Sequence, residues 1–274
     1  MDSEQIVDLK LSFTKYLTGL ERVESMVDGD SDSSLCNYLN WRDDLELPME
    51  VSQLRYLHAH ATENQLFHTR FPHVTHLTVF PNPNYGDANN QPIDSLEHFS
   101  HLESLRLVCG LREEYLQRLL NRHGANLRSL IIEQVEDHIV DLNFISARCQ
   151  LLEVLDISTK FTISSKYLFP ELKKLSLRCI EFDFDDIKLS YLLNIPNLED
   201  LRIRDISIHT FDLDDLRGDC ANMISNPPVL RQLEYLEISV WEDELFEDEI
   251  ELARQYFKAL NPNLHRFVSL YYPR

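Results

Sequence analysis

The sequence predicts an α/β fold: a curved solenoid with a parallel β-sheet on its concave face and helices and loops on its convex face. Three observations predict it. A six-residue pattern, apolar-x-x-apolar-x-apolar, recurs along most of the 274 residues. The copies return at a nearly regular interval, and several segments between them have apolar residues at helical spacing. With 43% hydrophobic residues, the chain can also fill a continuous core.

The copies of the pattern define the repeat. Their first residues are Leu54, Val74, Leu102, Leu127, Leu152, Leu172, Leu198, Leu233 and, in a degenerate copy, Leu264. Most of these starts are 20 to 28 residues apart, the interval expected for a unit of one strand and one returning segment. The last two intervals are 35 and 31 residues, so we expect insertions in segments 205–232 and 240–262.

Each copy has the pattern of a short strand. The second and third apolar residues alternate with other residues, which is the period of a strand with one buried face. No unit covers its own apolar edge, so stacking the units pairs the strands into one parallel sheet. We expect helices at residues 111–121, where Gly124 follows as a stop, and at residues 187–192 and 250–260, which both precede a proline.

The phrases that lead into the strands carry a resemblance to a known family. Examples are Phe169-Pro170-Glu171-Leu172 and Ile195-Pro196-Asn197-Leu198. These repeats resemble the irregular leucine-rich repeats of F-box proteins and, more distantly, those of the ribonuclease-inhibitor type. The resemblance covers roughly residues 51–272 and implies a leucine-rich-repeat domain over residues 51–274. The Asn or Cys expected nine places into each repeat is mostly absent, so the resemblance assigns no subfamily.

Residues 1–50 are expected to form an N-terminal capping region with one or two degenerate repeats. Ile6, Leu9 and Leu11 fit the repeat pattern, and the first full repeat needs a cover. The phrase at residues 47–51 resembles the opening of an F-box. An F-box would need about 40 residues of helical pattern next, whereas a strand pattern begins at Leu54.

The strand residues that flank the buried ones are expected to point to the concave face. They include six Lys or Arg and four Asp or Glu, so this face is slightly basic on a chain of net charge -20. We expect a partner's acidic or phosphorylated segment to bind there. The residues predicted for this site are Arg106, Lys174, Arg178, Arg202, Arg204 and Tyr235. Alternatively, these cations pair locally with Asp200, Asp156 or Glu199.

A second candidate surface is an acidic rim that follows a strand. Residues 242–251 hold seven carboxylates among ten positions. The predicted partner-binding residues are Trp241, Glu242, Asp243, Glu244 and Phe246, which would receive a basic client protein with the aromatic rings as anchors. Alternatively, the run is a solvated charged face.

Metal binding and catalysis have little support in the sequence. His58 and His60 share one strand face and His76 lies on the next strand, a possible zinc arrangement, but a concave surface also carries ordinary exposed polar residues. No phosphate-binding glycine loop, nucleophile elbow or His-Glu-x-x-His motif is present. We therefore expect no enzyme activity and no cofactor.

The amino-acid composition narrows the classes of partner that the chain is expected to bind. The strong acidic balance disfavours nucleic acid and anionic membranes. Five scattered cysteines without a Cys-x-x-Cys pair indicate reduced thiols, and no apolar run reaches membrane-spanning length, so we expect a soluble intracellular protein, cytoplasmic or nuclear. The predicted function is binding of another protein, as an adaptor or scaffold. The alternatives are substrate recognition for a ubiquitin ligase, through a ligase adaptor, and an acidic chaperone for a basic client.

Overall fold

The structure is a computed structural model of the chain. It describes residues 54–60, 67–81, 94–108, 111–133, 139–163, 169–178, 192, 195–206, 232–240, 264 and 266–271. The chain divides into two compact units, Met1–Leu127 and Arg128–Arg274. Each unit is described by itself.

The described residues of the first unit contain three parallel strands. They are β1 (Tyr56–His60), β2 (His76–Phe80) and β3 (Ser104–Leu107). The apolar positions of the repeat align: Leu57 pairs with Leu77, and Leu77 pairs with Leu105. Four helical elements are described in this unit: α2 (Phe67–Arg70), η2 (Asp94–His98), α3 (Glu113–His123) and η3 (Gly124–Asn126).

Helix α3 confirms the helix predicted at residues 111–121, displaced by two residues. Glu113 and Glu114 occupy its first turn and Arg122 its last, a charge order that the helix dipole favours. Leu116, Leu119 and Leu120 are buried on one face, as the spacing requires. Gly124 does not terminate the helix in a left-handed conformation. Its φ is -52°, and the chain continues there into the 3-10 turn η3.

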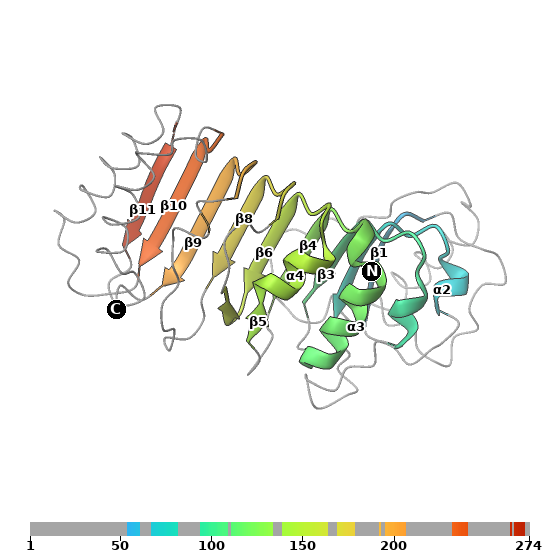
Figure 1. The fold of residues 1–274 in the computed structure, drawn as a ribbon. Helices are drawn as coiled ribbons and strands as arrows, with labels where there is room; N and C mark the ends of the chain where they lie inside the picture. The colour runs from blue at the N-terminus through green and yellow to red at the C-terminus, as the bar shows by residue number, and fades with distance from the viewer. Residues whose placement is uncertain are drawn as a thin grey trace, which may run out of the picture. The chain divides into compact units, whose positions relative to one another are not determined.

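In the described part of the second unit, six strands lie side by side in chain order. They are β4 (Ser129–Glu133), β6 (Val154–Ser158), β8 (Lys174–Arg178), β9 (Asp200–Ile206), β10 (Tyr235–Val240) and β11 (Arg266–Tyr271). All are parallel and in register, with Leu155 opposite both Leu130 and Leu175 (Figure 1). The register shifts once, between Ile238 and Val240, where β10 pairs with β9.

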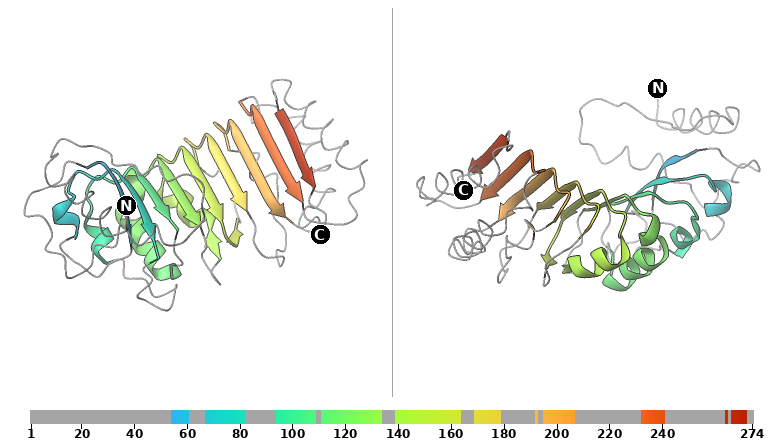
Figure 2. Two further views of the ribbon diagram at one scale, coloured as in Figure 1. Left: turned by 180° about the vertical axis from the view of Figure 1, so that it is seen from behind. Right: turned by 45° about the horizontal axis from the view of Figure 1, so that its top comes forward.

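Helix α4 (Leu142–Arg148) lies on one side of this sheet (Figure 2). Its N-terminus is capped by Asp141, whose carboxylate accepts a hydrogen bond from the backbone N–H of Asn143 at 2.8 Å. The short strands β5 (Val140–Asp141) and β7 (Phe161–Thr162) flank it and pair with each other. The sequence pattern predicted neither this helix nor this strand pair.

The core is made by the repeat positions. In the copy that begins at Leu127, Leu127, Leu130 and Ile132 have no exposed surface, and the copies at Leu152 and Leu172 are equally buried. The fully buried side chains of both units therefore confirm the predicted core. The degenerate copy is also a strand in register, because Phe267 pairs with Leu236 and Ser269 with Ile238.

A hydrogen-bond ladder joins the residues that precede the strands. The carbonyl of Arg128 accepts from the N–H of Glu153 at 2.8 Å, and the carbonyl of Glu153 accepts from Lys173 at 2.9 Å. Glu199 and Glu234 continue the series at 2.8 Å each. Because each repeat forms the same hydrogen bond with the repeat before it, the strands that follow these residues all start at the same edge of the sheet.

The structure thus shows a mixed α/β fold with parallel strands in each unit. The predicted helices at residues 187–192 and 250–260 lie outside the described residues except for Leu192, as does the capping region at residues 1–50. Among the helices that are described, none combines the length and the apolar character needed to cross a membrane.

Candidate functional site

The candidate site is the outward face of the sheet in the second unit. Strand alternation buries one set of side chains and turns the other away from the core. Along β4 and β6 the outward residues are half-buried, whereas the residues between them are buried. Helix α4 covers the opposite side, and no described helix or strand of this unit lies over the outward face (Figure 2). The outward side chains of β4, β6 and β8 therefore keep solvent exposure, whereas Glu237 and Ser239 on β10 are buried.

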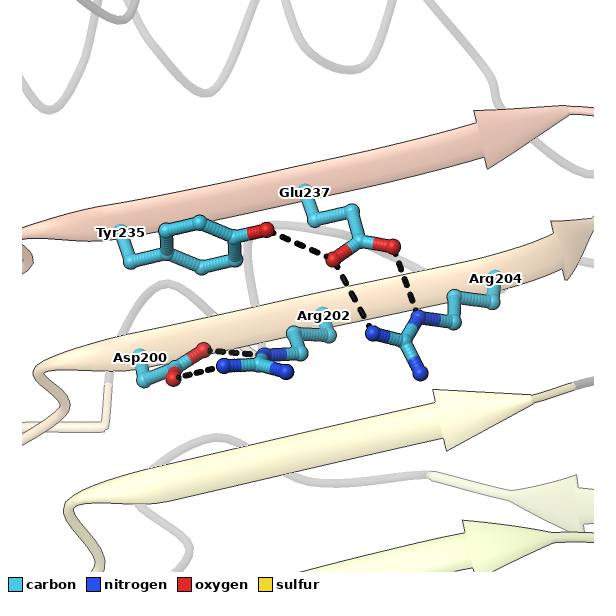
Figure 3. Close-up of polar contacts among 5 residues, drawn as sticks. All are labelled: Asp200, Arg202, Arg204, Tyr235 and Glu237. Carbon is cyan, nitrogen blue, oxygen red and sulfur yellow. Dashed lines mark hydrogen bonds and ion pairs between the residues drawn. The ribbon is translucent and has the colours of Figure 1, made fainter. Parts of the chain in front are cut away.

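Three side chains on β9 and β10 form the first part of this site. Arg202 binds Asp200, two residues earlier on the same strand, through two hydrogen bonds (Figure 3). Its Nε donates to Oδ1 of Asp200 at 2.9 Å, and its Nη2 donates to Oδ2 at 2.7 Å. Its guanidinium also lies 4.8 Å from the ring centroid of Tyr235 on the next strand. The hydrogen bond to Asp200 raises the pKa of Arg202. These contacts fix the guanidinium in one orientation.

Glu237 is the centre of the second part. Its carboxylate accepts hydrogen bonds from Arg204 at 2.7 and 3.1 Å and from the hydroxyl of Tyr235 at 2.8 Å (Figure 3). Glu237 is buried although it belongs to the outward row. The hydrogen bond from Arg204 holds its pKa below the usual range, against the opposing effect of burial. A buried carboxylate is tolerated because three donors replace its water.

Asp156 on β6 lies in a different environment. Burial raises its pKa, and the negative charge of Glu133 acts in the same direction. A hydrogen bond with Ser176 and the charges of Arg204 and Arg178 oppose this. The net shift of the Asp156 pKa is therefore upward, opposite in direction to that of Glu237.

The predicted basic patch is only partly brought together as a binding surface. Lys174 and Arg178 are exposed at the two ends of β8. On β9, Arg202 and Arg204 are engaged by carboxylates. The alternative of local pairing is confirmed for Arg202, whose partner is Asp200 as expected. Arg204 also pairs locally, but with Glu237, which is not among the carboxylates predicted to pair with the patch.

Glu237 could have been found from the strand alignment. Its register partner is Arg202, and Arg204 is one outward position further along β9. The sequence could not show which of the two arginines it would bind, because both are within reach of a flexible carboxylate.

The other predicted partner-binding residues lie away from this site or outside the described residues. Arg106 is exposed on β3 in the first unit. Trp241, Glu242, Asp243, Glu244 and Phe246 of the acidic rim lie outside the described residues, as do nearly all of segments 205–232 and 240–262.

The histidines of the first unit contact aromatic rings. His76 stacks on Tyr56 with ring centroids 4.3 Å apart, and His58 lies 6.1 Å from the ring of Phe80. His76 Nδ1 is also within 2.9 Å of the hydroxyl of Thr75. His60 belongs to β1, but its side chain is outside the description. In the described part of the chain, no three His, Cys, Asp or Glu side chains are grouped to hold a metal ion.

An ion-pair ladder at the leading edge of the second sheet was not predicted. Glu153 binds Arg128 at 2.6 Å and Lys173 at 2.8 Å, and these three residues precede three successive strands. The hydrogen bonds from Lys173 and Arg128 lower the pKa of Glu153. All three side chains keep substantial solvent exposure, so the ladder belongs to the surface of the sheet edge.

No family model, curated protein or solved structure matches the chain.

Proposed function

We propose that this chain is a non-enzymatic protein-binding module of the leucine-rich-repeat type. In this proposal the two units form one curved solenoid, the outward face of the strands is its concave surface, and a partner protein binds there. The chain then acts as an adaptor or scaffold.

The observation that carries the proposal is the outward face itself. Parallel strands in register repeat one spacing of side chains, so a partner meets an extended array of contacts. On β9 and β10 these side chains hold each other in fixed rotamers through bidentate and cation–π contacts. A partner then binds to an already ordered surface and loses less side-chain entropy than it would on a mobile one.

Blocking substitutions test the proposal. Ser129 and Ser158 are small, half-buried residues on the outward face of β4 and β6. Replacing both with tyrosine adds bulk to this face without touching the core. Ala147 is exposed on α4, on the other side of the sheet, so Ala147→Tyr is the matched control.

The assay is affinity capture from cell lysate with the tagged full-length chain, followed by mass spectrometry. We expect at least one protein to be captured by the wild type and by Ala147→Tyr but lost from the Ser129→Tyr/Ser158→Tyr variant. If every captured protein is retained by the face variant, the outward face is not the binding surface and the proposal fails.

A further inference from the structure

Two aliphatic side chains are neighbours on the outward face of the second sheet. Ile131 on β4 and Val154 on β6 are half-buried, on the side of the sheet that turns away from the leucine core. The register pairs Ile131 with Asp156 and Val154 with Ser129, so the two aliphatic residues lie diagonally next to each other. The other outward residues of β4, β6 and β8 are polar or charged.

Lys174 on β8 lies directly beside this aliphatic pair. The register places it opposite Val154 on one side and opposite Asp200 on the other. Both carboxylate oxygens of Asp200 bond Arg202 instead of Lys174. In the part of the chain that the structure describes, Lys174 is exposed and takes part in no hydrogen bond or ion pair. Its ammonium group is therefore available to a ligand.

The arginines of the same face are already engaged. Arg202 and Arg204 are each held by a carboxylate through two hydrogen bonds, and Arg178 also has an interaction of its own. A ligand that bound any of them would have to displace an existing contact. Lys174 can bind a carboxylate without such a loss.

We propose that Ile131, Val154 and Lys174 form the docking site for an extended segment of a partner protein with the pattern apolar-x-acidic. The apolar side chain of the segment covers the aliphatic pair, and the carboxylate two residues later binds the ammonium group of Lys174. This inference deepens the proposed function and rests on it. It follows the general arrangement of protein interfaces, in which an apolar centre is bordered by polar and charged groups.

The spacing of the strands sets the pattern. Neighbouring strands are about 4.8 Å apart, so the point midway between β4 and β6 is about 7 Å from β8. In an extended segment that crosses these strands, side chains two residues apart point the same way and are about 6.8 Å from each other. Adjacent side chains point in opposite directions, so a segment with the acid directly after the apolar residue cannot make both contacts.

Asp156 decides on which side of the aliphatic pair the acid lies. It is the next outward residue of β6 after Val154 and is half-buried. A partner carboxylate over β6 would meet its negative charge, whereas one over β8 meets Lys174. Carboxylates elsewhere on the chain, whose net charge is -20, are screened beyond about 8 Å at physiological ionic strength.

Two fluorescent peptides test the pattern. Both have a sequence rich in serine and threonine with one leucine and one aspartate. The aspartate stands two residues after the leucine in the spaced peptide and directly after it in the adjacent peptide. Each is titrated with the full-length chain at about 150 mM salt and followed by fluorescence anisotropy. We expect the spaced peptide to bind about fivefold or more tightly than the adjacent one.

Two substitutions with matched controls test the residues. Ile131→Ser should weaken binding of the spaced peptide by about threefold or more, whereas Ile139→Ser, at an exposed isoleucine before β5, should leave it unchanged. Lys174→Glu should weaken it by about fivefold or more. The control Lys173→Glu, at the neighbouring lysine that binds Glu153, should change it by less than about twofold.

An exchange of charges keeps the test independent of folding. A third peptide carries lysine in place of the aspartate of the spaced peptide. The Lys174→Glu variant should bind it about fivefold or more tightly than the wild type does, because the charges are again complementary. Such a gain requires that the outward face of the variant is folded.

Several outcomes overturn the inference. These are no binding of the spaced peptide, equal binding of the two aspartate peptides, equal effects of a substitution and its control, or no gain for the lysine peptide. If Ser129→Tyr/Ser158→Tyr loses a lysate partner that Ile131→Ser and Lys174→Glu both retain, the proposed function stands and this docking site falls. If no variant of the outward face affects any lysate partner, both fall.

Discussion

Replacing Glu237 with glutamine should destabilise the second unit more than any comparable change at an exposed carboxylate. The substitution keeps the size of the side chain but removes its charge and exchanges one accepting oxygen for an NH2 group. Arg204 and Tyr235 present three donors to this position. At least one of them would face another donor.

The magnitude follows from the burial of the pair. Removing one partner of a buried ion pair costs about 3–5 kcal/mol. The Arg204 side chain keeps 29% of its exposure, so water compensates part of the loss. We expect a loss of about 2 kcal/mol in the free energy of unfolding, which lowers a urea midpoint by about 0.7 M at an m-value of about 3 kcal/mol/M.

The assay is urea unfolding of the full-length chain followed by far-UV circular dichroism. Glu153→Gln is the matched control, since Glu153 also binds two cations but at the exposed edge of the sheet. Exposed pairs of this kind contribute little, so its midpoint should stay close to that of the wild type. Equal shifts for the two variants would refute the argument that burial makes the Glu237 network strong.

The pH dependence gives an independent check. The pKa of Glu237 is lower in the folded than in the unfolded chain, so its contribution is present above the unfolded value, about 4.5, and is lost as pH falls through the folded value. The difference between wild type and Glu237→Gln should therefore shrink below about pH 4.5 and be largest at neutral pH. A difference that grows on acidification would contradict the assignment.

Three further predictions concern buried groups outside the outward face. Burial lowers the pKa of His123, whose ring lies 3.0 Å from the Leu96 carbonyl oxygen. The free energy of unfolding should therefore decrease as the pH falls below about 6.5. In urea titrations at pH 5 to 7, His123→Gln should reduce this pH dependence. Ser146→Ala should lower the free energy of unfolding by about 1–2 kcal/mol, because the Ser146 hydroxyl accepts a hydrogen bond at 3.1 Å from the backbone N–H of Phe169, whose φ is 54°. The control Ser129→Ala, at a half-buried position, should change the urea midpoint little. Burial raises the pKa of the Cys149 thiol to about 12. Peptide mass spectrometry should therefore find Cys149 unmodified after treatment of the native chain with iodoacetamide at pH 8, and modified once urea unfolds the chain. Labelling in the native state would contradict its burial.

The residues at the edges of the repeats show where sequence reasoning failed. Phe169 was correctly assigned to the phrase before a strand, but nothing in the pattern showed that it adopts a positive φ. Pro170 disfavours the ordinary helical conformation of the residue before it, and the buried hydroxyl of Ser146 on α4 supplies the partner that fixes this geometry. Helix α4 itself was missed because it has only seven residues, too few for a clear helical period.

The sequence by itself determined the strands, their register and the core. A period of two within each copy and a nearly constant interval between copies leave one way to bury the leucines, since slipping a strand by one residue would turn its apolar set outward. It also placed the outward residues in rows. Only the tertiary structure decided how those rows are used: which carboxylate each arginine binds, and that Glu237 is buried while Lys174 and Arg178 stay exposed. These choices depend on side-chain rotamers across neighbouring strands, and several pairings are nearly equal until packing selects one.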